Sequence, residues 1–363
     1  MKIILVIKHL IWCIFIVFTN CDPLDFLLKN NITIQKLFKD LPICYILPIQ
    51  QSYNLNCYKN YSQLGLYHEH NHDLLIHDFL KEKYHRTTRV HTSESIFFLP
   101  VYTSDCYGYN AKQPFSWKNL EKDVAIIADQ VENFVADRTF VSSSFPHSIP
   151  SAAYGKLRYV YDLRYIRVDN AFTANGRDVY VPYVVDDEVL VEMININRTQ
   201  FLFAPCRPSA GKLDESRNWR EKAFEGLRHL PNSSVVRNID EVSFQRAMKS
   251  HLFCAIIPGD TGSSSKLYKA IFYGCIPIVF YSSLTHLPFN RFLDWTSFSV
   301  LIPKEQLNSR VLLNRTISSL MQIDYQRIRR YQRNLQIVAP LFRWSNSNWP
   351  SLYHFMLLEV AIF

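Results

Sequence analysis

Short apolar runs alternate with longer amphipathic segments along most of this 363-residue chain. Runs of strand length and composition occupy residues 95–102, 157–168, 179–184, 201–204, 235–236, 253–257, 276–280 and 298–302. Segments with helical spacing of apolar residues occupy 73–84, 123–138, 218–230, 240–250, 264–273, 304–321, 324–339 and 347–362. Strands that alternate with helices predict an α/β fold with a mostly parallel sheet.

A charged, Asn-rich segment at residues 186–199 interrupts this alternation, which then starts again. We therefore expect two α/β domains, over residues 42–190 and 200–345, followed by a closing helix within 346–363. With 48% hydrophobic residues, the chain is long enough to form two cores. A ligand would lie in the cleft between the two domains.

The most informative stretch for function is the strand–loop–helix–strand pattern over residues 253–280. A Gly/Ser loop follows the first strand, and Gly274 follows the helix, where glycine is preferred. The loop and the helix start offer unpaired backbone N–H groups and a positive dipole end, so this unit can bind phosphate. It has neither a Walker lysine nor a G-x-G-x-x-G motif. By pattern alone it also describes an ordinary βα connection.

The same stretch carries a family resemblance. The run F-C-A-I-I-P-G-D-T-G-S-S-S-K-L-Y-K-A-I-F-Y-G-C-I-P-I-V-F, followed by L-P-F-N-R-F-L-D-W, resembles the donor half of the exostosin family of glycosyltransferases. Weaker matches precede it in the family's order, at Tyr45–Pro48, Ser95–Tyr102, Asp178–Tyr183 and Ser216–Asn218. The resemblance covers about residues 42–362. It implies a GT-B fold, in which two Rossmann-like domains face each other across a cleft, with closing helices at the C-terminus.

The resemblance also implies a reaction, the inverting transfer of a sugar from a nucleotide sugar, usually a UDP-sugar, onto a glycan or glycoprotein acceptor. Several residues would shape the donor pocket around the diphosphate: Gly259, Asp260, Ser263, Ser264 and Ser265. Lys266 would replace an arginine of the family, and Arg217 is the next cation for the leaving diphosphate. Because cations and helix N-termini can stabilise that charge, we expect no metal or other cofactor.

Inversion needs one general base near the acceptor hydroxyl, supplied by the N-terminal half. Asp105, just after a predicted strand, is the first choice and Asp162 is the second. A capping or turn role explains either aspartate equally well.

Lys269 departs from the family pattern. The family has an acid there, which accepts hydrogen bonds from the ribose hydroxyls, whereas a lysine can only donate. Lys266 also lacks the bidentate geometry of an arginine. An alternative hypothesis therefore remains open, a non-catalytic relative that serves as scaffold or partner subunit of another glycosyltransferase. The partners we expect are a nucleotide sugar, a glycan acceptor and a second subunit in a hetero- or homodimer, without nucleic acid.

The N-terminal segment, residues 1–20, predicts entry into the secretory pathway. Its apolar residues are interrupted by Lys8 and His9, which favours a signal peptide over a membrane anchor, although a small-residue cleavage pattern is absent. Five N-x-S/T sequons agree with a location in the Golgi or endoplasmic reticulum lumen: Asn31, Asn60, Asn197, Asn232 and Asn314. The formal net charge of +8 suits a lumenal enzyme that handles anionic nucleotides or acidic glycans.

The cysteines and histidines predict little further chemistry. In an oxidising compartment Cys44 and Cys57 are one option for a disulfide, whereas we expect Cys254 and Cys275 to behave as small buried hydrophobes. No C-x-x-C pair occurs, so we expect no zinc site. The histidines between Tyr67 and His91 lack the spacing of a zinc protease and are interpreted as surface or capping residues.

Overall fold

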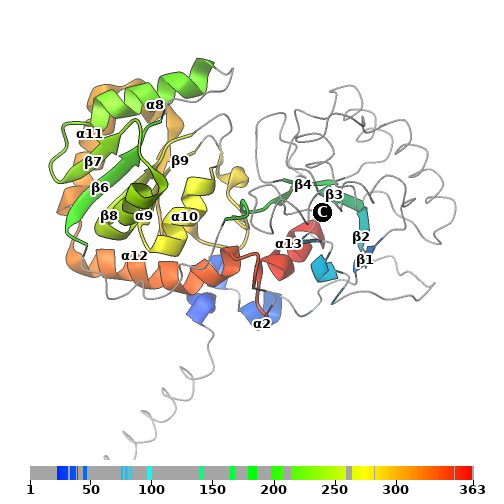
Figure 1. The fold of residues 1–363 in the computed structure, drawn as a ribbon. Helices are drawn as coiled ribbons and strands as arrows, with labels where there is room; N and C mark the ends of the chain where they lie inside the picture. The colour runs from blue at the N-terminus through cyan, green and yellow to red at the C-terminus, as the bar shows by residue number, and fades with distance from the viewer. Residues whose placement is uncertain are drawn as a thin grey trace, which may run out of the picture.

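The computed structural model describes most of the C-terminal half of the chain and shorter segments of the N-terminal half (Figure 1). The described residues are 23–31, 33–37, 39, 44–46, 75–76, 78–80, 82, 96–99, 139–142, 164–167, 179–185, 198–207, 214–258, 264–281, 283–346 and 348–361. The predicted helix at 123–138, the linker at 186–197 and the histidines between Tyr67 and His91 lie outside these residues.

Five short strands of the N-terminal half form one sheet, in chain order. They are β1 (Cys44–Ile46), β2 (Ile96–Leu99), β3 (Thr139–Ser142), β4 (Arg164–Arg167) and β5 (Val179–Tyr180). Every neighbouring pair is parallel, so the chain must cross over after each strand. The parallel sheet expected from the alternation of elements is confirmed in this half.

The C-terminal half forms a second parallel sheet with the order β10-β9-β8-β6-β7. Its strands are β6 (Gln200–Pro205), β7 (Ser233–Val236), β8 (His251–Ile256), β9 (Ile276–Tyr281) and β10 (Val300–Pro303). β6 lies between β7 and β8, so the chain first builds the sheet in one direction and then reverses. Such a reversal is the topological switch point of a doubly wound sheet, at which ligands bind beyond the carboxyl ends of the strands.

Six helices of eight or more residues are described, all of them around or after the C-terminal sheet (Figure 1). They are α8 (Asp214–Leu227), α9 (Glu241–Ser250), α10 (Ser265–Tyr273), α11 (Arg310–Ser319), α12 (Tyr325–Val338) and α13 (Leu352–Ala361). Shorter helical turns are η1 (Pro23–Leu27), η2 (Lys29–Asn31), α2 (Ile34–Leu37), η5 (Leu284–His286), η6 (Trp295–Ser297), η7 (Lys304–Asn308), η8 (Leu320–Gln322) and η9 (Ala339–Phe342).

The single helix predicted over residues 304–321 is wrong, because the structure divides it into η7, α11 and η8. Ser309 separates the first two, with an extended backbone and a hydroxyl that accepts a hydrogen bond from the N–H of Leu312 at 3.2 Å. A serine in this role starts a new helix and ends the preceding turn.

The interpretation of Cys254 and Cys275 as small buried hydrophobes is also wrong, because they form a disulfide. Cys254 lies in β8, and Cys275 directly precedes the neighbouring strand β9. Pairing of these strands brings the two Cα atoms within 5.8 Å. The bridge closes the chain around the end of β8, the following loop and α10, while Cys206 remains a free and buried thiol.

Arg198 holds together the opposite, amino end of the C-terminal sheet. Its guanidinium is buried and donates to the carbonyls of Met248 and His251, each at 2.7 Å, and to that of Tyr273. These carbonyls belong to the C-terminal ends of α9 and α10, where backbone acceptors lack helical partners. Burial lowers the pKa of Arg198 to about 10, which leaves it charged at neutral pH.

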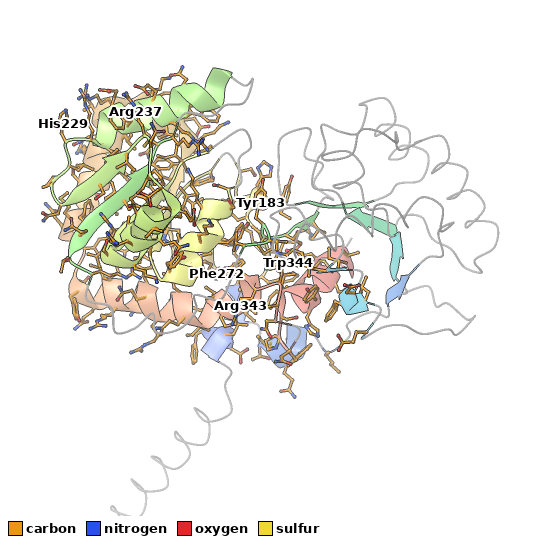
Figure 2. The ribbon with its side chains drawn as sticks, in the orientation of Figure 1. Tyr183, His229, Arg237, Phe272, Arg343 and Trp344 are labelled. Atoms are coloured by element: carbon orange, nitrogen blue, oxygen red, sulfur yellow. A yellow bond between two sulfur atoms is a disulfide. The ribbon has the colours of Figure 1, made fainter. Side chains whose placement is uncertain are left out.

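The chain after α12 packs against β5 and the residues that follow it. The indole Nε1 of Trp344 donates to the carbonyl of Pro182 at 3.2 Å, and the hydroxyl of Tyr353 on α13 donates to the carbonyl of Trp344 at 2.7 Å. The ring of Tyr353 also stacks on Phe79, with centroids 4.1 Å apart. Figure 2 shows Trp344 and Tyr183 in the middle of the molecule, between the two sheets. These contacts join α13 to the residues that follow β5.

Glu359 is a buried carboxylate on α13. Its Oε2 lies 3.3 Å from Nε of Arg291, which belongs to the segment after β9. Burial raises its pKa to about 7, although Arg291 and Lys29 oppose the shift.

Within the part of the chain that the structure describes, no helix has the length and apolar character needed to cross a membrane.

Candidate functional site

The candidate site lies where β6 and β8 end, at the switch point of the C-terminal sheet. β6 ends at Pro205 and is followed by Cys206 and Arg207, whereas β8 ends at Ile256 and leads toward α10. Because neighbouring parallel strands end at the same edge, residues that follow β6 and β8 meet although about fifty positions separate them in sequence.

Lys266 marks this meeting point. It lies in the first turn of α10, and its ammonium group is 3.4 Å from the carbonyl oxygen of Pro205 at the end of β6. The side chain is half-buried against the sheet edge. The predicted cation therefore reaches across the switch point from one βα unit to the other.

Two further cations share this edge. Arg220, on α8, donates from Nη1 to the carbonyl of Arg207 at 2.9 Å, which ties the helix to the segment after β6. Burial, followed by the charges of Arg220, Arg207 and Lys269, lowers the pKa of Lys266 to about 8. Burial is the largest cause of this shift, and the neighbouring positive charges add to it. A bound anion would oppose the part that comes from those charges.

Two groups near this cluster that could carry negative charge, Glu221 and Cys206, are paired or neutral. The carboxylate of Glu221 is engaged by Arg237, which lies beside α8 in Figure 2 and also stacks its guanidinium on Phe224. Burial raises the pKa of the Cys206 thiol to about 12, so this group stays neutral. These two groups therefore contribute little negative charge to the edge.

The N-terminus of α10 adds a backbone contribution. Ser264 is its N-cap, and the hydroxyl oxygen accepts from the N–H of Lys266 at 3.3 Å. The positive end of the helix dipole thus points at the same edge as the Lys266 ammonium. Ser264 and Ser265 are both half-buried there.

Lys269, one turn further along α10, faces a neighbouring helix. Its ammonium lies 3.0 Å from Oε1 of Glu241 on α9 and 5.5 Å from the centroid of the Phe244 ring. Position 269 of α10 thus has a lysine where the family pattern has an acid. The carboxylate of Glu241 on α9 lies within hydrogen-bonding distance of this lysine.

For the remaining predicted residues, the structure describes only the backbone of one, Arg217. The backbone of Arg217 lies in the first turns of α8, at the same carboxyl edge as Lys266. Five predicted site residues lie outside the described residues: Asp105, Asp162, Gly259, Asp260 and Ser263. Their roles stay predictions.

Arg207 and Arg220 were not among the residues expected from sequence. The available signal was their position, since Arg207 directly follows an apolar strand and Arg220 lies one turn after Arg217 in a helix that starts at the same edge. Both positions also suit a solvated charge, so sequence alone did not separate them from other surface arginines.

No group of three or more metal-ligating side chains occurs in the described residues. Residues 259–263, in the loop between β8 and α10, are outside the described residues, so a metal-independent site stays a prediction.

Comparison with known proteins identifies a family. The Exostosin GT47 domain matches residues 40–317 of this chain. A protein of Arabidopsis thaliana named "Probable arabinosyltransferase ARAD1" is 23% identical over an alignment of 274 residues, and the match covers 70% of this chain and 58% of that protein.

Two further proteins of the same plant match shorter segments. "Probable glycosyltransferase At5g03795" is 26% identical over 33% of this chain and 22% of its own length. "Probable glycosyltransferase At3g07620" is 25% identical over 36% of this chain and 27% of its own length. The chain therefore spans less than two thirds of each of these relatives.

Proposed function

Because the chain belongs to the Exostosin GT47 family, we propose that it is a glycosyltransferase that uses a nucleotide sugar, with a UDP-sugar as the first choice. The observation that carries the proposal is the position of Lys266, which joins Arg207 and Arg220 at the switch point of the C-terminal sheet. A diphosphate placed there would meet three cations and a helix N-terminus.

The proposed architecture is GT-B, with the acceptor bound by the N-terminal domain and the donor by the C-terminal domain. Two parallel sheets, one in each half, support it, and so does the switch point in the second sheet. The acceptor would enter the cleft between the domains, and the contact of Trp344 with Pro182 would help to set the orientation of the two halves.

The proposed chemistry is a direct displacement with inversion. A carboxylate of the N-terminal half, Asp105 or Asp162, would take the proton of an acceptor hydroxyl as its oxygen attacks the anomeric carbon. The bond from that carbon to the diphosphate breaks, and its electron pair leaves with the nucleotide. Lys266, Arg207, Arg220 and Arg217 would stabilise this negative charge, so the reaction would not need a metal.

A secretory location is part of the proposal. The Cys254–Cys275 disulfide supports it, because stable disulfides form in oxidising compartments such as the lumen of the endoplasmic reticulum or Golgi. Among the predicted sequons, Asn232 is exposed, whereas the Asn314 amide donates to the carbonyl of Gly226 at 3.1 Å between two helices. Asn232 is therefore the better placed of these two for glycosylation.

One observation favours the alternative of a non-catalytic scaffold or partner subunit. Lys269 is paired with Glu241 and cannot accept hydrogen bonds from a ribose, so the donor contact expected at this helix position is missing. The same pair is compatible with an active enzyme if the ribose is bound elsewhere.

Nucleotide binding separates the two functions. We expect UDP to stabilise the full-length protein in a thermal-shift assay and to bind measurably by calorimetry, because the cations of the switch point gain a counter-charge. Lys266→Ala should weaken UDP binding by about tenfold or more. Lys249→Ala is a matched control, since Lys249 is exposed at the far end of α9.

Absence of stabilisation by UDP, GDP and their sugars would support the scaffold function. Equal affinity of Lys266→Ala and Lys249→Ala for UDP would show that the diphosphate does not bind at the switch point.

A further inference from the structure

The outward face of α12 carries positive charge that the proposed donor site does not use. Four arginines of this helix are exposed to solvent: Arg327, Arg329, Arg330 and Arg333. We call them the arginine face. α12 contains no acidic residue, and the next one after Asp324 in the sequence is Glu359, which is buried on α13.

Within the described residues, the arginine face also has no counter-charge from other elements. Asp324 is engaged as the N-cap of α12, where its Oδ1 accepts from the N–H of Arg327 at 2.8 Å. Across the described segments, the ion pairs involve other cations than these four arginines. The face therefore presents uncompensated charge to the solvent.

The helix that carries the arginines is fixed to the C-terminal domain. Tyr331, Leu335 and Val338 are buried on its inner side, and the Asn334 amide donates to the carbonyl of Ser297 at 2.7 Å. Because the inner side is held by packing and a hydrogen bond, the spacing of the outer arginines is set by the helix itself.

Two tyrosines order the arginine side chains. The guanidinium of Arg329 lies 5.0 Å from the centroid of the Tyr325 ring, and its Nε donates to the tyrosine hydroxyl at 2.5 Å. Arg327 makes the corresponding contacts with Tyr331, at 5.7 Å and 3.3 Å. An ordered arginine loses less side-chain entropy when it binds a ligand, and the terminal nitrogens of Arg329 remain available for one.

The arrangement of the arginines suits a linear polyanion. With 3.6 residues per turn, Arg329, Arg330 and Arg333 fall within about 100° of arc, and Arg329 and Arg333 lie about 6 Å apart along the axis. A chain that bears regularly spaced anionic groups can therefore meet more than one guanidinium at once.

A glycan fits this face better than a membrane does. Apart from the arginines, the exposed side chains of α12 are Gln326 and one aromatic, Tyr325, whereas a helix that lies on a membrane needs a broad apolar face to insert. Tyr325 is 66% exposed and offers an aromatic ring with a polar edge, on which a sugar ring can pack. The Cys254–Cys275 disulfide supports an oxidising compartment, where acidic polymers are glycans rather than nucleic acids.

We infer that the arginine face binds an acidic glycan chain through the carboxylate or sulfate groups of the glycan. Glycan binding by the arginine face does not depend on the donor site, because the face lies on α12, whereas Lys266 lies on α10 beside the end of β6. If the proposed glycosyltransferase activity holds, the bound glycan is a distal part of the acceptor, and the acceptor class is polyanionic.

The test compares two triple variants of the full-length protein. Arg329→Ala/Arg330→Ala/Arg333→Ala removes three of the four arginines of the arginine face and keeps Arg327. Arg246→Ala/Arg310→Ala/Arg315→Ala removes the same charge from exposed positions on α9 and α11. The probes are heparin, dextran sulfate and polygalacturonate, with neutral dextran as reference. Heparin carries both anionic groups, and the other two polymers separate sulfate from carboxylate.

We expect the first variant to bind at least one anionic polymer roughly 100-fold more weakly than the wild-type protein, since each surface arginine contributes about a factor of five. The slope of the logarithm of affinity against that of salt concentration should fall by about three. The dispersed variant should lose less than about fivefold. Arg329→Lys/Arg330→Lys/Arg333→Lys should fall between these values, because lysine keeps the charge without the guanidinium fork.

Equal losses in the two alanine variants would overturn the inference, because net charge alone would then explain binding. Tighter binding of anionic phospholipid vesicles or of RNA than of every glycan would also overturn it. UDP affinity, measured on the same samples, should be unchanged in the first variant, so that failure of glycan binding and failure of the donor site are distinguished. A melting temperature close to the wild-type value shows that each variant is folded.

Discussion

The Cys254–Cys275 disulfide is expected to make a large and local contribution to stability. The two residues are 21 positions apart, and the loop they close contains the end of β8, the donor loop and α10. Loop-closure entropy for this separation is about 11 cal/mol/K, or about 3 kcal/mol at room temperature. For a domain of this size the loss corresponds to a melting temperature lower by roughly 6–12 °C.

Reduction is the best perturbation, because it leaves both buried sulfur atoms in place and creates no cavity. We would compare the melting temperature of the wild-type protein with and without dithiothreitol, and count thiols after alkylation. The matched control is Cys254→Ala/Cys275→Ala, in which reductant has no such bridge to open. The reduced protein should also bind UDP more weakly, since the bridge then no longer closes the segment that carries Lys266.

Two results would refute the reasoning. If reductant lowers the melting temperature of the wild-type protein and of the double variant equally, the effect comes from cysteines elsewhere in the chain. If alkylation shows Cys254 and Cys275 as free thiols in the oxidised protein, the bridge does not form in solution.

Three further predictions concern charged groups. The folded-state pKa of Glu359, about 7, exceeds its ordinary value of 4.5, so the folded protein holds a proton that the unfolded chain releases and stability falls as pH rises through this window. Glu359→Gln should therefore increase the free energy of unfolding at about pH 8 by up to about 3 kcal/mol, with a higher melting temperature, and change both little at about pH 5. An effect of the same size at both pH values would contradict this. Above about pH 8 Lys266 loses its proton, so UDP affinity should decline there in the wild-type protein but not in Lys266→Arg, as calorimetry at several pH values would show. Arg198→Ala should destabilise the protein by roughly 3–5 kcal/mol in urea unfolding, because it leaves carbonyls at two helix ends without a donor; a loss below about 1 kcal/mol would mean that water replaces the guanidinium.

The donor-half motif was well predicted from sequence because its signals are local. Gly274 adopts the left-handed conformation expected after a helix, with φ of 69°, and its N–H bonds back to the last turn of α10. Asp240 caps α9 by accepting a hydrogen bond from the N–H of Ser243 at 2.9 Å. Such caps involve residues three or four positions apart, so sequence spacing reveals them directly.

The errors arose where distant residues decide the outcome. An apolar neighbourhood around Cys254 and Cys275 is equally typical of buried thiols and of a buried disulfide, and only the pairing of β8 with β9 brings the two together. The break at Ser309 was missed because the apolar spacing of a helix continues across it, while the backbone follows the cap.

The sequence by itself determined most strands and helices of the C-terminal half, several of their ends and the family to which the chain belongs, because hydrophobic periodicity, capping and motif spacing act over a few residues. The tertiary structure decided which of these elements meet. Only the order of strands in the C-terminal sheet places β6 beside β8, and only then does Lys266 reach Pro205, 61 residues earlier in the chain, and share an edge with Arg207 and Arg220. Strand order depends on the packing of whole layers around a core, which no short stretch of sequence specifies.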